Sequence, residues 1–366
     1  MKLVFVTQVL DRGDAVLGFV LRWVEGLARH AESVRVVALT VGDTSGLPDN
    51  VDWIALGRRG VVGRYLRYRA ALRRSFREGY DGLLTHMVPR YSAVGARWAR
   101  AADVPHYLWY THKGVDARLL RAVEVVDGVF TASDASMRVD TPKKIVTGHG
   151  IDALHFDALP RVPRDGRTRL LSVGRLTPSK DPLVVVEALS HLRDEGRDVT
   201  LTWAGAALAR GDDEYGAMVQ RAIEGRGLGD SVHLVGAVPY PEVPELYRDA
   251  DLFVSASRTG SVDKVVLESM ASRLPFVSCN ESIPPLLLGD EDLAPAADDF
   301  VFPVGDAERL ADRIRGWIDM DPVERARRAG LLRDLIVRDH EVDRLMERLV
   351  ATMIEAGHGR RGGARS

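Results

Sequence analysis

Short β-rich runs alternate with helical patterns along almost all of this 366-residue chain, and this alternation is the feature that most constrains its fold. In the first 150 residues the strand-like runs are Leu3–Thr7, Val34–Leu39, Leu83–Thr85, Tyr107–Tyr110, Gly128–Ala132 and Ile145–Thr147. Helical patterns such as Gly18–His30 and Tyr65–Arg77 lie between these runs. Strands that alternate with helices at this spacing favour a parallel sheet covered on both faces.

The same pattern restarts in the second half of the chain. The strand-like runs there are Leu170–Val173, Thr200–Ala204, Val232–Val235, Leu252–Ser255 and Phe276–Ser278, and the helical patterns are Asp181–Asp194, Glu214–Gly225, Glu242–Arg248 and Lys264–Ser272. The intervening segment Gly148–Arg167 is rich in Gly, Pro, Asp and Arg, which is typical of a domain boundary. We therefore predict an α/β protein with two Rossmann-like, doubly wound parallel-sheet domains, at residues 1–160 and 161–340.

Only helical patterns follow Pro303, at Ala307–Ile318, Pro322–Val337 and His340–Ala356. We assign residues 341–366 to a C-terminal helix and a tail. The tail, Gly357–Ser366, is rich in Gly and Arg, a composition that predicts disorder.

Composition excludes several classes of protein. The chain is 46% hydrophobic, which is enough for sizeable cores, and its formal net charge of -2 gives no global attraction to nucleic acid. One cysteine, Cys279, excludes an internal disulfide framework and indicates a reducing, cytoplasmic compartment. The N-terminal apolar run is too short for a signal peptide, and no run approaches the ~18–20 apolar residues of a spanning helix.

Polar residues with the chemistry of an anion site follow the first strand of the second domain. Gly174, Arg175 and Lys180 surround a predicted strand-to-helix turn, at the carboxyl edge where open α/β sheets bind ligands. A glycine turn, a forked cation, a flexible cation and a helix N-terminus together suit a diphosphate. The spacing is not that of a Walker A loop. Taken singly, such loop cations are more often solvated surface charges.

A second loop of this kind leads from Ser255 through a Ser/Gly-rich stretch into a predicted helix that carries Glu268. A glutamate one turn into a helix can accept two hydrogen bonds from a ribose diol, and the free amides at the helix start face an anion. An exposed helical glutamate with no ligand is the alternative.

Together these motifs resemble glycosyltransferase family 4, the retaining nucleotide-sugar transferases of the GT-B fold, over nearly the whole chain. The family's G-R-x-x-x-x-K loop is matched from Gly174 to Lys180, its G-x-V/x-P segment by Gly236–Pro239, and the second glutamate of its E-x7-E motif by Glu268. The resemblance implies a GT-B fold in which Arg175 and Lys180 hold the donor diphosphate and Glu268 holds the ribose.

The chain departs from the family at the start of the acidic motif. Gly260 stands where the first glutamate would fall, and Ser261, Val262 and Asp263 replace the usual Gly-Phe-Gly. In the family this stretch meets the donor sugar, so the change affects donor identity more than activity, and Asp263 or Lys264 is expected to supply the polar contact. The residues expected at the donor are Gly18, Gly174, Arg175, Lys180, Gly205, Val238, Gly260, Ser261, Asp263, Lys264 and Glu268.

The first domain resembles the family less tightly. Alignment of its first helix places Gly18 on the first glycine of the family's Gly-Gly loop, and Asp14 in a longer loop on the acceptor side. His112 follows a strand and matches the family's histidine beside the transferred sugar, which makes His112, with Arg175 and Lys180, a catalytic candidate. His86 follows another strand and is expected on the acceptor side. For either histidine a structural role is the commoner alternative.

The segment Arg58–Arg77 contains eight arginines and no acidic residue. Tyr65, Tyr68, Leu72 and Phe76 fall on one helical stripe. One interpretation packs this stripe on the sheet and leaves the arginines in water. The other is peripheral attachment to an anionic membrane, on the inner face of which the enzyme would meet a lipid-linked acceptor.

The resemblance implies retaining transfer of a hexose-type sugar from a nucleotide diphosphate sugar to a hydroxyl acceptor, with no cofactor and no protein nucleophile. No Asp-x-Asp pair follows a predicted strand and no histidines have H-x3-H spacing, so we expect no metal. The alternatives are a nucleotide-sugar epimerase or phosphorylase on the same scaffold, and a sugar-nucleotide-binding subunit without activity. The base, sugar and acceptor stay open.

Overall fold

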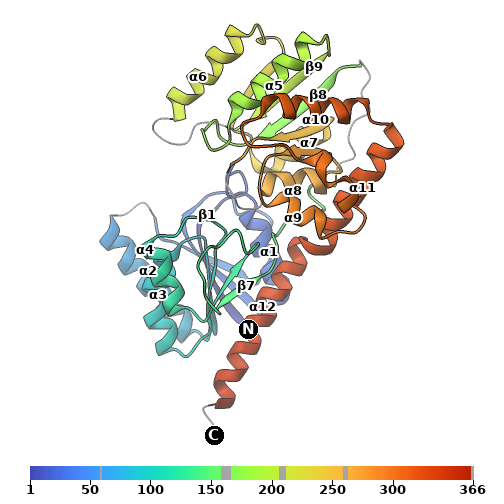
Figure 1. Ribbon diagram of the computed structural model, residues 1–366. Coiled ribbons are helices and arrows are strands. Elements are labelled where there is room, and N and C mark those ends of the chain that lie inside the picture. Colours follow the sequence, from blue (N-terminus) through green and yellow to red (C-terminus); the bar gives the residue numbers. More distant parts are fainter. Residues whose placement is uncertain (58–59, 158–165, 206–211, 259–262, 364–366) are drawn as a thin grey trace. The chain divides into compact units, whose positions relative to one another are not determined.

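The computed structural model describes residues 1–57, 60–157, 166–205, 212–258 and 263–363, which form two compact units (Figure 1). The first unit comprises Met1–Gly150 together with His340–Ser366, and the second comprises Ile151–Asp339. The division therefore lies ten residues before the expected boundary at residue 160, and the C-terminal helix is part of the first unit.

The first unit contains a seven-stranded, entirely parallel sheet with the order β3-β2-β1-β4-β5-β6-β7. Its strands are β1 (Lys2–Leu10), β2 (Ser33–Val41), β3 (Val51–Ala55), β4 (Gly82–His86), β5 (His106–Trp109), β6 (Gly128–Thr131) and β7 (Lys144–Val146). Successive side chains of a strand point to opposite faces, and in β1 Leu3 and Phe5 belong to one core while Val4 and Val6 belong to another. Apolar residues on both faces are what a parallel sheet covered by helices requires.

Helices cover both faces of this sheet. Helices α1 (Val20–His30) and α12 (Val342–Gly363) pack on the face of Leu3 and Phe5, whereas α2 (Val61–Arg77), α3 (Pro89–Ala101) and α4 (Ala117–Val125) pack on the other. Helix α12, red in Figure 1, runs along α1.

The disorder predicted for Gly357–Ser366 is wrong for Gly357–Gly363, which continue α12. Arg360 on this part of the helix forms ion pairs with Asp103 and Asp127 of the same unit. These pairs give the Gly- and Arg-rich segment a partner surface that composition alone does not reveal. Residues 364–366 lie outside the described part of the chain.

The second unit contains a five-stranded parallel sheet with the order β10-β9-β8-β11-β12. The strands are β8 (Thr168–Val173), β9 (Val199–Ala204), β10 (Val232–Gly236), β11 (Leu252–Ser255) and β12 (Phe276–Ser278). The helices are α5 (Pro182–Asp194), α6 (Asp212–Gly225), α7 (Val243–Arg248), α8 (Lys264–Ala271), α9 (Ile283–Leu288), α10 (Ala307–Asp319) and α11 (Pro322–Asp339), with short 3-10 turns η1 (Tyr240–Glu242) and η2 (Ala294–Phe300). Helix α5 contacts α6 and α10, and α8 contacts α11.

All strands are parallel, but the side of the sheet to which the chain adds its next strand changes at one point in each sheet. In the first unit β1 is flanked by β2 and β4, and in the second unit β8 is flanked by β9 and β11. The loops that follow two such neighbouring strands leave toward opposite faces of the sheet and open a crevice at its carboxyl edge, where α/β proteins bind ligands. The prediction of two doubly wound parallel-sheet domains is confirmed.

A buried arginine fastens α11 to the rest of the second unit. The guanidinium of Arg333 donates to the carbonyl oxygen of Ala153 at 3.1 Å and to that of Ala271, the last residue of α8, and its Nη2 lies 3.0 Å from Asp157 Oδ2. The side chain is 9% exposed, and this burial lowers the pKa of Arg333. Two buried carbonyl groups thus accept from one cation, and Asp157 pairs with both Arg333 and Arg273.

Replacing Arg333 with methionine should lower the free energy of unfolding by about 3 kcal/mol, because it leaves buried acceptors without a donor. Chemical denaturation monitored by tryptophan fluorescence measures this change. Arg327→Met is the matched control, since Arg327 pairs with Glu324 on the surface of the same helix and should cost less than about 1 kcal/mol. Equal losses in the two variants would contradict the role given to Arg333.

Candidate functional site

Two glycines form the floor of a candidate site at the carboxyl edge of the second sheet. Gly174 follows β8 with φ +151°, and Gly205 follows β9 with φ +141°. A Cβ atom on Gly205 would lie 2.1 Å from the carbonyl oxygen of Gly174, so neither a side chain nor a wider turn fits there. The indole of Trp203 donates to the same oxygen at 2.7 Å. The result is a fixed stretch of bare backbone that a ligand can approach closely.

Lys180 lies beside this glycine pair. Its Nζ lies 2.8 Å and 3.0 Å from the two carboxylate oxygens of Asp263, and 3.3 Å from Ser257 Oγ. Asp263 precedes α8 and also accepts a hydrogen bond from Ser255 Oγ at 3.2 Å. Loops after β8 and β11, the two strands at the point of reversal, therefore meet through this ion pair.

Glu268 lies one turn into α8 and is buried, in contrast to the exposed glutamate considered as the alternative. The hydroxyl of Tyr247 donates to its Oε2 at 3.2 Å, and Lys264 Nζ lies 3.5 Å from its Oε1. Burial raises the pKa of Glu268, with Lys264 acting against this shift, and burial lowers the pKa of Lys264 to about 8. The carboxylate of Glu268 favours the charged form of Lys264, and the ammonium of Lys264 favours the charged form of Glu268.

The other residues on the donor side differ in their burial and in their partners. Arg175 is exposed directly after Gly174, and Val238 packs against the core of the unit. Arg258 forms an ion pair with Asp181, and its backbone N–H donates to Ser179 at 2.9 Å. Gly260 and Ser261 lie outside the described residues. Among those that are described, no three His, Cys, Asp or Glu side chains gather as a metal-ligand group.

Sequence reasoning missed Tyr247, Ser257 and Arg258. Ser257 and Arg258 follow β11, so the rule that favours strand ends could have found them. Tyr247 lies on α7, 21 residues before Glu268, and no motif marks it.

In the first unit, Asp14 and Gly18 belong to the loop between β1 and α1. Asp14 Oδ1 accepts from the backbone N–H groups of Val16 and Leu17 at 2.9 and 2.7 Å, and Gly18 N–H donates to the Asp14 carbonyl at 2.9 Å. The side chain of Asp14 therefore shapes its own loop.

The two candidate histidines of the first unit, His86 and His112, have opposite environments. His86, the last residue of β4, is buried, with its ring 5.1 Å from that of Trp23 and 5.9 Å from that of Phe5, and its Nδ1 is 3.3 Å from Thr7 Oγ1. These surroundings are those of a structural histidine. His112 is exposed after β5, and its Nδ1 accepts from Gly114 N–H at 3.0 Å. In the neutral ring this bond leaves the proton on Nε2.

The arginine-rich segment forms α2, with Arg58 and Arg59 outside the described residues. Tyr68 and Leu72 are fully buried against the sheet, as the apolar stripe predicts. Val61, Val62 and Leu66, however, are 64%, 71% and 51% exposed. Within the described ranges, none of the helices combines the length and the apolar character that crossing a membrane requires.

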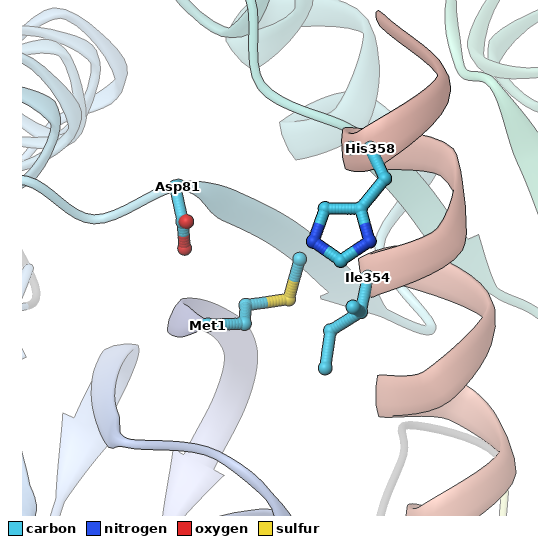
Figure 2. A pocket seen from close by; sticks show the side chains of 5 residues that line it. Met1, Asp81, Ile354 and His358 are labelled. Atoms are coloured by element: carbon cyan, nitrogen blue, oxygen red, sulfur yellow. The ribbon is translucent and has the colours of Figure 1, made fainter. Parts of the chain in front are cut away.

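A small pocket lies elsewhere in the first unit. Figure 2 shows the side chains of Met1, Asp81, Ile354 and His358 around it. Met1 and Asp81 immediately precede β1 and β4, so this pocket lies at the amino edge of the sheet, away from all the expected site residues of the unit.

Comparisons with known proteins find a matching family model and similar glycosyltransferases. Residues 160–330 match the family model described as glycosyl transferases group 1. The chain is 32% identical over 194 residues to the amylovoran biosynthesis glycosyltransferase AmsK of Erwinia amylovora (50% of this chain, 45% of that protein). It is 29% identical over 178 residues to the alpha-D-kanosaminyltransferase of Streptomyces kanamyceticus (49% and 43%). The matches thus span about half the length of these curated relatives.

The fold has solved counterparts over the whole chain. The structure of Anabaena HepE in complex with UDP aligns with a TM-score of 0.74 at 18% identity, covering 97% of this chain and all of that one. The apo lipopolysaccharide outer core galactosyltransferase WaaB aligns with a TM-score of 0.66 at 12% identity, covering 97% of this chain and 100% of that one. These alignments show the GT-B fold. The family match itself covers residues 160–330, so this part of the chain belongs to the glycosyl transferases group 1 family.

Proposed function

We propose that this protein is a retaining glycosyltransferase that moves a hexose-type sugar from a nucleotide diphosphate sugar to a hydroxyl acceptor. The observation that carries the proposal is the Gly174–Gly205 contact beside the Lys180–Asp263 ion pair at the reversal point of the second sheet, with buried Glu268 one turn into the helix that follows Asp263. The family match over this unit and the UDP complex of HepE support it.

The proposed chemistry follows from the charges at this edge. Departure of a nucleoside diphosphate develops negative charge on its β-phosphate, and Lys180, Arg175 and the free amides at the start of α8 are the groups that stabilise it. Glu268 holds the ribose hydroxyls. The acceptor hydroxyl attacks on the face that the leaving group vacates and gives its proton to the departing phosphate, as in the family the chain resembles. In this proposal no metal takes part.

Two alternative functions, an epimerase and a binding subunit without activity, would require different residues or show different kinetics. An epimerase needs protein acid and base groups near the anomeric centre, and Gly260 stands where the family has a carboxylate. A binding subunit without activity would retain nucleotide affinity and show no turnover. Assay of the purified chain against a panel of nucleotide sugars and acceptors separates these rivals from the proposal.

Lys180→Ala and Glu268→Ala should each weaken nucleoside diphosphate binding or lower turnover about 10- to 150-fold, equivalent to about 1.5–3 kcal/mol for hydrogen bonds to charged groups. Isothermal titration and steady-state kinetics measure these losses. Arg197→Ala and Asp319→Ala are matched controls, because this exposed ion pair belongs to the same unit and is outside the proposed site. Unchanged affinity and turnover in both folded site variants would remove the site. Activity lost with chelator and restored by Mg2+ or Mn2+ would contradict the metal-free step.

His112 is proposed to position the transferred sugar. Replacing it with alanine should lower turnover about 10- to 100-fold while leaving affinity for the free nucleoside diphosphate unchanged, because only the transition state would lose the contact. His191→Ala, an exposed histidine on α5, is the control. An equal loss of nucleotide affinity and turnover in His112→Ala would show that this role is wrong.

We further propose that α2 contacts an anionic membrane surface. Its first turns expose Val61, Val62 and Leu66. Further along the same helix Arg64 is half-buried, and the exposed arginines are Arg67, Arg69, Arg73, Arg74 and Arg77. Each arginine near anionic lipid contributes about 1 kcal/mol, and the apolar side chains add partition into the interface. Such attachment would bring the enzyme close to a lipid-linked acceptor.

Replacing Arg64, Arg67, Arg73 and Arg74 together with glutamine should abolish sedimentation with phosphatidylglycerol vesicles at low salt, because it removes most of the charge of α2. Nucleotide binding should be unaffected. The control replaces four exposed arginines of the second unit, Arg193, Arg221, Arg309 and Arg327, and should still sediment. Wild-type protein that stays in the supernatant would favour the solvated-helix interpretation.

A further inference from the structure

The ammonium group of Lys180 is fully engaged by groups of the protein itself. Its side chain is 20% exposed, and that of Asp263 is 10% exposed. Both oxygens of Asp263 and one serine hydroxyl surround the Nζ atom. A cation so far removed from water needs a counter-ion, since an unpaired buried charge costs several kcal/mol. Asp263 supplies that counter-ion.

Asp263 has a second option that it does not use. It is the N-cap residue of α8, where an aspartate commonly accepts a hydrogen bond from the free N–H groups of the first turn. Its side chain makes no such bond. The carboxylate instead faces Lys180 and Ser255. Both of its oxygens accept from the ammonium of Lys180, as two oxygens of a phosphate group could do. Asp263 is therefore ion-paired with the lysine that the proposed donor diphosphate requires.

We propose that Asp263 is an internal competitor of the donor: its carboxylate holds Lys180 in the unliganded protein and must give way when the diphosphate of a nucleotide sugar binds. The inference rests on the proposed function. It differs from a contact between Asp263 and the donor sugar, because it assigns the residue an effect on nucleoside diphosphates that carry no sugar.

Two consequences follow from charge alone. A diphosphate brings more negative charge to Lys180 than one carboxylate does, so it can displace Asp263, but the repulsion between the two anions lowers its affinity. Removing the charge of Asp263 while keeping its shape frees Lys180 for the ligand. Asp263 thus limits retention of the nucleoside diphosphate product, which a transferase must release.

The test is calorimetric titration of the full chain with UDP, GDP and ADP. Asp263→Asn should bind the preferred nucleotide about fivefold or more tightly than wild type, and the difference should shrink at high salt. Asp263→Ser serves as a second variant if the asparagine form does not fold. Asp319→Asn makes the same charge change at an exposed ion pair of this unit and should bind as wild type does.

The outcomes separate this inference from the proposed function. Binding by wild type with equal or weaker binding by the folded Asp263 variants would overturn the competitor role and leave the donor site standing. Binding only by the Asp263 variants would support the role strongly. Absence of binding by every form would overturn both. A double variant with Lys180→Ala should lose most of the gain, because the gain acts through the freed ammonium; a gain that persists in full would also overturn the competitor role.

Discussion

The reversal of strand order beside β8 is the constraint on which the candidate site depends. Because β8 is flanked by β9 on one side and by β11 on the other, the loops that follow β8 and β11 diverge over the same edge of the sheet. That divergence places Lys180 after one strand opposite Asp263 after the other. The close Gly174–Gly205 contact leaves no room for a side chain on Gly205. A sheet that added its strands in sequence order would separate β8 from β11, and Lys180 would then lie far from Asp263.

Charge pairing is the second organising feature of this edge. Lys180 and Asp263 form one largely buried pair, and Lys264 and Glu268 form another within the first turns of α8. Each pair combines one cation with one anion, and Arg175 adds a further positive charge at this edge. A diphosphate ligand must therefore rearrange existing ion pairs instead of meeting an open positive surface. Asp263 belongs to the stretch in which this chain differs from the motif that it resembles, so the difference places a carboxylate against Lys180.

Much of the fold could be predicted from local patterns, and the failures have physical reasons. All five strands of the second sheet were predicted because their residues form short runs rich in β-branched and apolar side chains, bounded by turns. Strand β3 was missed because Asp52 and Trp53 are exposed on this edge strand, which leaves little periodicity in five residues. The tail was predicted as disordered because the partners of Arg360 are more than 200 residues away in sequence.

The candidate site, like the fold, could be predicted only in part from the sequence. The rule that favours residues after strand ends selected Gly174, Lys180 and Glu268, because the positions of glycines, cations and acids after predicted strands can be read from the sequence alone. It also selected His86, but the rule cannot say where a side chain points, and Trp23 and Phe5 enclose that ring. The partner of Lys180 lies 83 residues further along the chain, and only the folded sheet identifies it.

The central claim is that the carboxyl edge of the second sheet holds a nucleotide sugar. A crystal structure of the protein with its preferred nucleoside diphosphate tests this claim most directly. Phosphate oxygens are expected within hydrogen-bond distance of Lys180 Nζ, beside the Gly174–Gly205 contact, with ribose hydroxyls on the carboxylate of Glu268. A nucleotide bound at any other place, with Lys180 and Glu268 both free of it, would contradict the account.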